Sequence, residues 1–261
     1  MGAFARVTPP PSTKVTYLGH ASLLFESQGE VIVVDPVFSP RIARFFTRLT
    51  SRSTFLPEEL RGTVGILISH AHHDHLDYPS LKRFGKECPI VVPWGIERSM
   101  RLRGYKNVRT IRRWEELALG RWKVTAVPAR HFGGRIPYLF TSGYQGYVLS
   151  GPATIYFAGD TGFDAGIFRE IRNRFRIDLA VLPIAGSVFP GYRRNHMNAE
   201  DALRAFRALG ARRMLPVHYG TYPASFESSG VARQRILEAS RSEGAATGLE
   251  LVSEGASIHV G

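Results

Sequence analysis

The sequence predicts a layered α/β domain in which helices lie outside β-sheets. Short apolar runs with the length and branched composition of strands recur along the 261 residues, and helical patterns fall between several of them. Strands dominate the first part of the chain, whereas strands and helices alternate in the second part. No internal repeat, low-complexity tract or domain-separating linker interrupts this order.

The expected strands are apolar runs bounded by turn residues. The first three lie at 14–18, 22–26 and 31–34, with Gln28-Gly29-Glu30 as the turn between the last two. The remaining expected strands are 64–69, 90–93, 123–128, 146–149, 153–158, 179–184, 213–217 and 257–260.

Three helices are expected from their caps and spacing. Asp77 can accept a hydrogen bond from the first turn of a helix through 80–84. Asn198 opens a second helix, which stops at Gly210 because glycine readily adopts the left-handed conformation that ends helices. The third helix fits residues 231–241.

The composition, 44% hydrophobic and 21% charged residues, is that of an ordinary globular protein. Residues 1–12 are expected to form a short extended arm, because they contain three consecutive prolines and lack the apolar core of a secretory signal. Residues 13–261 are expected to form one domain. The single cysteine, Cys88, excludes an internal disulfide framework, so a cytoplasmic location is expected. No apolar stretch approaches the roughly 20 residues that span a bilayer.

The formal net charge of +12 has two explanations. It reflects either an arginine-rich surface spread over the whole molecule, or an anionic partner such as a phosphate ester, an acidic lipid headgroup or a nucleic acid. The first explanation is favoured, since composition does not reveal whether the charges gather on one face.

The segment 39–57 departs from the pattern, because it contains no acidic residue. Its apolar residues recur at helical spacing, at Ile42, Phe45, Phe46 and Leu49. Its arginines follow a similar spacing on a neighbouring face, at Arg41, Arg44, Arg48 and Arg52. Two interpretations stay open. The segment is either a helix or loop packed on the core by its phenylalanines, or a basic amphipathic element that touches a membrane surface or lines the entrance for an acidic, partly apolar substrate.

Residues 70–75 read His-Ala-His-His-Asp-His, directly after the expected strand 64–69. Four imidazoles and one carboxylate in so short a segment are hard to explain as packing, and both groups are good ligands for zinc, manganese or iron. Open α/β folds place their chemistry at the carboxyl ends of strands. The segment therefore indicates a metal site, with a catalytic role as the first interpretation.

Three further candidates, His131, Asp160 and His218, each follow an expected strand and lie close to a glycine that allows a tight turn. Singly, each has an ordinary structural explanation as a hydrogen-bonded loop residue. Their joint occurrence with the histidine-rich segment favours a shared metal site instead.

With these motifs, the sequence resembles the metallo-β-lactamase superfamily over essentially the whole chain, beginning at Gly19-His20-Ala21-Ser22. The resemblance implies a four-layer αββα sandwich, with two mixed sheets, helices outside and a dinuclear metal site between the sheets. It assigns one metal to His70, His72 and His131, and the other to Asp74, His75 and His218, with Asp160 bridging. It makes Asp35 an acid that orients the ligands and His20 a supporting residue, which could equally hold its loop by hydrogen bonds.

Four stretches, 18–22, 35–39, 156–162 and 196–202, look like one branch of the superfamily. That branch contains the ascorbate-6-phosphate lactonases and the N-acyl phosphatidylethanolamine-hydrolysing phospholipase D. Lactamases proper use a cysteine ligand, whereas Cys88 lies far from any ligand position and Asp160 supplies a carboxylate. Tyr219 stands where phospholipase-like members usually carry tryptophan, which leaves the substrate pocket open.

The resemblance implies a hydrolase with two divalent metal ions, zinc first, with manganese or iron also suitable. A water shared between them would lose its proton and attack a phosphodiester or phosphorylated small molecule, phospholipids included. Asp74 or Asp160 would aim that water. His196 would contact the substrate or protonate the leaving group, unless it is a solvated loop residue. The candidate substrate-binding residues are Arg193, Arg194 and Tyr219.

Three alternatives stay open. A lactonase or other carboxylic ester hydrolase would use the same metals. A nucleic-acid phosphodiesterase is disfavoured, because the chain has no appended basic domain or aromatic-rich platform for stacking bases. A metal-dependent sensor without activity comes last, since all seven ligand positions are present. The expected partner is a small anionic or lipid-like substrate. Peripheral contact with a membrane is a further open alternative, and the sequence does not determine the oligomeric state.

Overall fold

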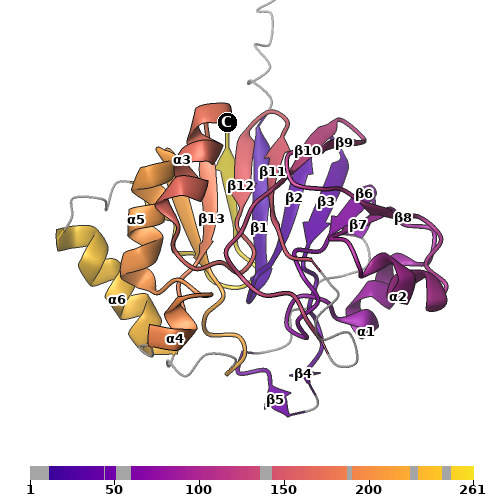
Figure 1. Cartoon of the computed structure of the whole chain (residues 1–261), viewed down its shortest axis with the longest axis horizontal. Coiled ribbons are helices and arrows are strands. Elements are labelled where there is room, and N and C mark those ends of the chain that lie inside the picture. Colours follow the sequence, from indigo (N-terminus) through magenta and orange to yellow (C-terminus); the bar gives the residue numbers. More distant parts are fainter. Residues whose placement is uncertain are drawn as a thin grey trace, which may run out of the picture.

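In the computed structural model, two β-sheets face each other and helices cover their outer faces (Figure 1). The structure describes residues 12–43, 45–50, 60–135, 143–186, 190–223, 229–242 and 248–261. The expected N-terminal arm lies outside these ranges except for Ser12. The prediction of an αββα sandwich with two mixed sheets is confirmed.

The first sheet has seven strands in the order β15-β1-β2-β3-β6-β7-β8. Strands β15, β1, β2 and β3 pair antiparallel, whereas β3, β6, β7 and β8 pair parallel. The carboxyl ends of β3 and β6 therefore lie side by side. The strands are β1 (Thr13–Gly19), β2 (Ser22–Ser27), β3 (Glu30–Val34), β6 (Thr63–Leu67), β7 (Ile90–Val92), β8 (Val108–Thr110) and β15 (Ser257–Val260).

The second sheet has six strands in the order β14-β13-β12-β11-β10-β9. Its last three strands along the chain, β12, β13 and β14, pair parallel, so the loops that follow them leave from one edge. The strands are β9 (Glu116–Leu119), β10 (Trp122–Val127), β11 (Gly146–Ser150), β12 (Thr154–Phe157), β13 (Leu179–Pro183) and β14 (Arg213–Val217).

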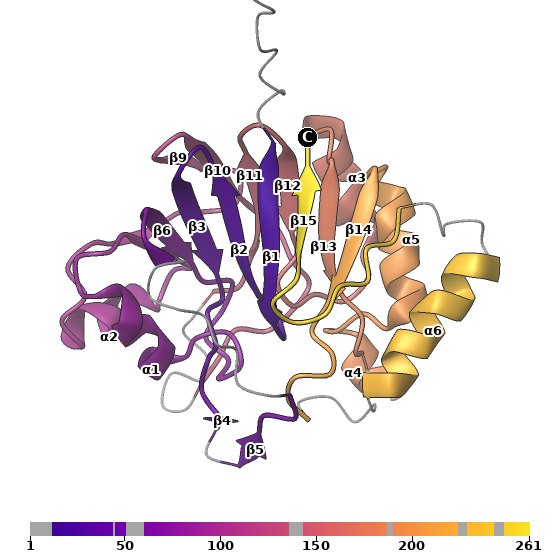
Figure 2. The ribbon, with the colours of Figure 1, turned by 180° about the vertical axis from the view of Figure 1, so that it is seen from behind.

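The main apolar core lies between the sheets and takes side chains from both, such as Phe25 of β2 and Tyr147 and Phe157 of the second sheet. Two further apolar clusters join the outer faces to helices, with α1 and α2 on the first sheet and α3, α5 and α6 on the second (Figures 1 and 2). The helices are α1 (Tyr78–Leu81), α2 (Glu97–Leu102), α3 (Ala165–Arg174), α4 (Pro190–Arg193), α5 (Ala199–Leu209) and α6 (Ser229–Ser242), and a 3₁₀ turn, η2 (Lys82–Phe84), follows α1.

The expected helix caps are confirmed. The Asn198 side chain accepts a hydrogen bond from the Asp201 backbone N–H at 2.9 Å, and Gly210 ends α5 with a left-handed φ of 61°. The Asp77 carboxylate accepts from the Ser80 backbone N–H at 3.1 Å at the start of α1. No helix among the described residues is long and apolar enough to cross a membrane.

The helical interpretation of segment 39–57 is wrong for the residues that the structure describes. Here β4 (Arg41–Ile42) and β5 (Phe46–Thr47) pair antiparallel as a short hairpin, with Ala43 at a left-handed φ of 48° that a right-handed helix does not contain. Phe45 and Phe46 do not pack on the core either, because they are 84% and 41% exposed. Arg44 and residues 51–59 lie outside the described residues.

Arg48 attaches this hairpin to the sandwich. Its buried guanidinium donates to the Val37 carbonyl at 3.2 Å, the Leu18 carbonyl at 3.3 Å and the Tyr222 hydroxyl at 3.1 Å. It also pairs with the Glu254 carboxylate, whose side chain is 15% exposed. A buried charge with these partners fixes the base of the hairpin to the end of β1 and to the C-terminal loop.

We expect Arg48→Met to lower the free energy of unfolding by about 3 kcal/mol, because it leaves the Glu254 carboxylate largely buried without its partner. Urea denaturation measures the change. Lys14→Met is the control, since its ion pair with Glu26 is solvent-exposed and its loss is expected to cost at most about 0.5 kcal/mol. Equal effects of the two substitutions would contradict the anchoring role of Arg48.

Candidate metal centre

The seven predicted ligands lie at the carboxyl ends of β6, β10, β12 and β14, where the two sheets open at one end of the sandwich. Together with His20, these seven residues form two groups of four, and the donor atoms of each group lie within 4.8 Å of one another. The first group is His70, His72, His131 and Asp160, and the second is His20, Asp74, His75 and His218. His20 therefore belongs to the site itself, because its ring lies among the donor atoms of the second group. The assignment of these residues to two metals stays a prediction.

In the first group, three ring nitrogens crowd around one point. His70 Nε2 lies 2.9 Å and His131 Nε2 lies 3.2 Å from His72 Nδ1. A neutral imidazole has one donor and one acceptor, so three converging nitrogens are poorly satisfied by hydrogen bonds alone. Tetrahedral zinc ligands at about 2.0–2.1 Å from the ion stand about 3.3 Å apart. The spacing of the three rings therefore fits a bound metal ion.

The far nitrogens of two of these rings have fixed partners. His70 Nδ1 lies 2.9 Å from the Ser69 hydroxyl, and His131 Nδ1 lies 3.0 Å from the Asn195 carbonyl. A ring that donates from Nδ1 to the carbonyl presents the lone pair of Nε2 to the centre. These contacts set the tautomer of His131 and the orientation of both rings.

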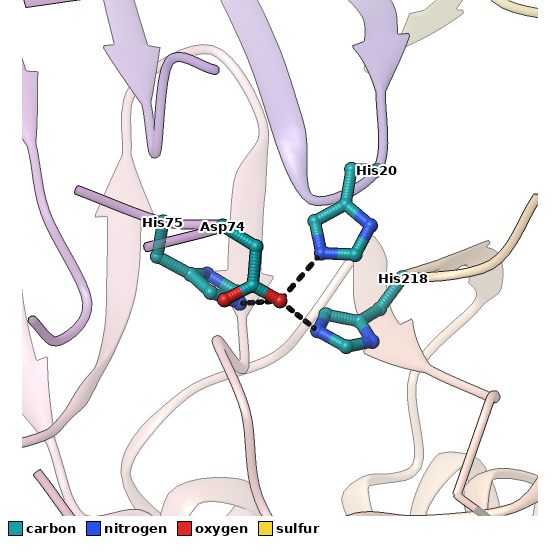
Figure 3. A group of neighbouring side chains, drawn as sticks. All are labelled: His20, Asp74, His75 and His218. Atoms are coloured by element: carbon teal, nitrogen blue, oxygen red, sulfur yellow. Dashed lines mark hydrogen bonds and ion pairs between the residues drawn. The ribbon is translucent and has the colours of Figure 1, made fainter. Parts of the chain in front are cut away.

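In the second group, the Asp74 carboxylate faces three imidazoles (Figure 3). Asp74 Oδ2 lies 3.0 Å from His20 Nε2, 3.4 Å from His218 Nε2 and 4.0 Å from His75 Nε2. His75 Nε2 and His218 Nε2 are buried and have no hydrogen-bond partner among the described residues. A buried nitrogen without a hydrogen-bond partner is unfavourable, and a cation bound between these nitrogens and the nearby carboxylates would satisfy both.

Asp160 contacts rings of both groups. Its Oδ2 lies 3.2 Å from His75 Nε2 and 3.6 Å from His70 Nε2, and its Oδ1 lies 3.2 Å from His218 Nε2. The carboxylate is almost completely buried. This is the position that a carboxylate shared by two cations would occupy.

The pKa values of the histidines are shifted in opposite directions by burial and by neighbouring carboxylates. Burial lowers the pKa of His70 well below its usual value and that of His131 to about 3, so these rings are neutral near pH 7. Burial also acts to lower the pKa of His218, but the charge of Asp160 outweighs it and raises that pKa to about 9. Without metal, a proton on His218 balances the buried carboxylates, and a metal cation would take over that role.

Asp35 lies beneath the second group, at the end of β3. Its carboxylate accepts hydrogen bonds from the Ser69 backbone N–H at 2.7 Å, the Ser69 hydroxyl at 2.5 Å and His75 Nδ1 at 2.7 Å. The bond from His75 Nδ1 leaves Nε2 free to face Asp160. Three residues here have left-handed backbone φ angles, 55° at His20, 40° at Asp35 and 63° at His218, and such strain gathers at functional sites.

His196 lies beside the first group and is only 6% exposed, so its interpretation as a solvated loop residue is wrong. Its Nδ1 lies 3.6 Å from Asp160 Oδ2, and its ring stacks on that of Tyr192 at 4.2 Å between centroids. Tyr192 was not a sequence candidate. The sequence did contain one signal for this contact, because residues four apart, such as 192 and 196, lie one helical turn from each other. The structure shows such a turn, in which the His196 backbone N–H donates to the Tyr192 carbonyl at 3.1 Å.

Two of the three candidate substrate-binding residues, Arg193 and Tyr219, have other contacts. The Arg193 guanidinium pairs with Asp201 of α5 at 2.8 Å, and Tyr219 packs against the apolar cluster under the helices. The Arg194 side chain is exposed. Their roles in substrate binding stay predictions. Phe132, which follows the predicted ligand His131 and was not among the predicted site residues, is 52% exposed, and its ring centroid lies 4.9 Å from those of both His72 and His131.

The fold is that of the metallo-β-lactamase class. The family model described as beta-lactamase superfamily domain matches residues 30–219, and the chain belongs to that family. Among curated relatives, a metal-dependent hydrolase of Rubrobacter xylanophilus is 30% identical, with 81% of this chain and 83% of that protein covered. The mitochondrial N-acyl-phosphatidylethanolamine-hydrolyzing phospholipase D of Saccharomyces cerevisiae is 33% identical, with 81% and 48% covered.

An uncharacterized protein of Mycobacterium tuberculosis is 30% identical over 88% of this chain, and the chain spans 64% of its length. Among solved structures, the isothiocyanate hydrolase from Delia radicum gut bacteria superimposes with a TM-score of 0.77 at 20% identity, covering 94% of this chain and 98% of that one. At this identity the likeness concerns the fold alone.

We expect His72→Ala and His218→Ala each to remove about one bound metal ion per chain, because each takes a ligand from a different group. Metal content after dialysis measures the loss. His73→Ala is the matched control, since His73 lies within the same histidine-rich segment but in neither donor group, and it is expected to keep the full metal content. A loss at His73 equal to that at His72 would refute the assignment.

We expect His20→Asn to weaken the binding of one metal ion by about 10- to 100-fold and to leave the other unchanged, because it removes the partner of Asp74. Asparagine is chosen because it tolerates a left-handed backbone. Metal titration by calorimetry separates the two affinities. Unchanged affinities would mean that His20 only holds its loop.

Proposed function

We propose that this protein is a metal-dependent hydrolase that cleaves phosphodiesters or other phosphorylated small molecules, phospholipids included, with two divalent cations, zinc first. The observation that carries the proposal is Asp160, a buried carboxylate that contacts rings of both donor groups. The relative from Rubrobacter xylanophilus is named a metal-dependent hydrolase, which supports the reaction class.

Two observations support an anionic, phosphate-bearing substrate. The yeast relative is named for hydrolysis of an N-acylated phospholipid, and a relative of the same name in Caenorhabditis elegans is 31% identical. The net charge of +12 favours the approach of anions over a lactone without charge.

The cations, when bound, would make water a nucleophile near neutral pH and polarise the oxygen of the scissile group. The chain's own residues hold the geometry for this chemistry. Asp74 Oδ2 lies 3.0 Å from His20 Nε2, and the burial of Asp160 keeps competing water away from its carboxylate. His196 stacks on Tyr192 with Nδ1 3.6 Å from Asp160 Oδ2. When doubly protonated, its ring would keep one proton on Nδ1 toward this carboxylate and donate the other, from Nε2, to the leaving oxygen.

We expect metal-loaded protein to hydrolyse bis-p-nitrophenyl phosphate, chelation to abolish this activity and Asp160→Asn to lower kcat by about 1000-fold or more. His73→Asn, outside both donor groups, is the control and is expected to keep the activity. Adding back zinc, manganese or iron separately identifies the metal.

A panel of lactones tested in parallel provides the contradicting outcome. If the protein hydrolyses lactones but not the phosphodiester, the proposal is wrong and the protein is a carboxylic ester hydrolase. Salt-sensitive cleavage of RNA or DNA in preference to small diesters would replace it with the nucleic-acid phosphodiesterase.

A further inference from the structure

Three large apolar side chains project from the hairpin β4–β5 and the residues after it. Phe45 is 84% exposed, Phe46 is 41% exposed and Leu49 is 61% exposed. We call these three side chains the apolar prong. Single exposed apolar residues are ordinary, but three within five residues concentrate exposed apolar surface in one short segment, which is costly to leave in water.

The prong is attached to the loop that carries His218. The Leu49 backbone N–H donates to the Thr221 carbonyl at 2.7 Å, and the Thr221 hydroxyl accepts from the His20 backbone N–H at 2.6 Å. The buried Arg48 side chain fixes the base through Tyr222, whose ring lies 5.5 Å from that of His20. Figure 1 shows β4 and β5 projecting beyond the ends of the sheets. The prong is therefore attached through Thr221 and Tyr222 to the loops that supply His20 and His218.

The exposed area is too small for a stable protein partner. A whole aromatic side chain offers about 200 Å², so the exposed parts of the three side chains sum to on the order of 400 Å². A specific interface between proteins buries about 800 Å² on each side. Insertion into a lipid surface needs only a few apolar side chains with basic residues beside them.

The charge around the prong fits an anionic surface. The segment 39–57 contains no acidic residue, and the Arg41 side chain is exposed, whereas Arg48 is buried and paired with Glu254. The chain as a whole carries a net charge of +12. Basic residues near a bilayer add attraction to anionic headgroups, and this attraction supplements the insertion of apolar side chains.

We propose that the apolar prong inserts into the surface of an anionic lipid bilayer and brings the metal centre to that surface. The proposal extends the proposed function by naming the surface on which a lipid-like substrate is met. Binding to lipid is measured without turnover, so the two proposals fail separately.

The test compares the full-length protein with the triple variant Phe45→Ser, Phe46→Ser, Leu49→Ser in sedimentation with vesicles. One set of vesicles is phosphatidylcholine alone, and in the other phosphatidylglycerol replaces half of it. We expect the wild type to prefer the anionic vesicles and the triple variant to bind them at least about tenfold more weakly. The matched control is Leu102→Ser with Val231→Ser, because these apolar side chains are 76% and 46% exposed on α2 and α6. The control is expected to bind like the wild type.

Hydrolysis of bis-p-nitrophenyl phosphate in solution is expected to be unchanged in the triple variant, because the prong contributes no donor atom to the metal centre. Loss of vesicle binding with normal hydrolysis supports the proposal. Wild-type protein that ignores anionic vesicles overturns it, and so does a triple variant that binds them normally. A change of oligomeric state in analytical ultracentrifugation, without a change in vesicle binding, would assign the prong to contact between two copies of the chain and also overturn it.

Discussion

The Asp35 carboxylate joins the end of β3 to the segment that supplies most of the candidate ligands. It has no exposed surface, and its hydrogen bonds go to Ser69 and His75. Ser69 in turn contacts His70, and His75 faces Asp160, so ring positions in both donor groups depend on this one buried acid. A buried carboxylate is tolerated only when such partners satisfy it, and the parallel pairing of β3 and β6 brings them together.

The donor atoms themselves are a destabilising feature of the fold. His75 Nε2, His218 Nε2 and Asp160 Oδ1 are buried without hydrogen-bond partners among the described residues. Left-handed backbone at His20 and His218 adds strain. The surrounding sandwich, with its continuous core between the sheets, offsets these costs. Natural proteins accept such costs where function requires them.

Local signals in the sequence predicted much of the fold and the groups of donor atoms. The Asn198 cap and the Gly210 stop fix α5 through contacts within a few residues, and apolar runs mark most strands. The short strands β8 and β9 were missed, because most of their residues are exposed or half-exposed and give no apolar run. Strand ends followed by histidine or aspartate gave the candidate ligands, and those after β6, β12 and β14 follow strands of the parallel parts of the two sheets.

Segment 39–57 was misread because its structure depends on distant partners. The spacing of Ile42, Phe45 and Phe46 fits a helix, but Arg48 pairs with Glu254, which is 206 residues away. The pairing of Arg193 with Asp201 also depends on how α4 approaches α5. Spacing along the sequence carries no information about such approaches.

The candidate ligands come from loops spread between His20 and His218, and they meet only when both sheets have paired. Half-formed structures would hold the histidines after β6 without Asp160 or His218. Metal ions therefore bind the completed fold far better than any partly folded form, and a hundredfold excess over the dissociation constant adds about 2.7 kcal/mol to its stability. The supply of free metal would thereby govern how long each copy of this protein survives in the cell as well as whether it is active.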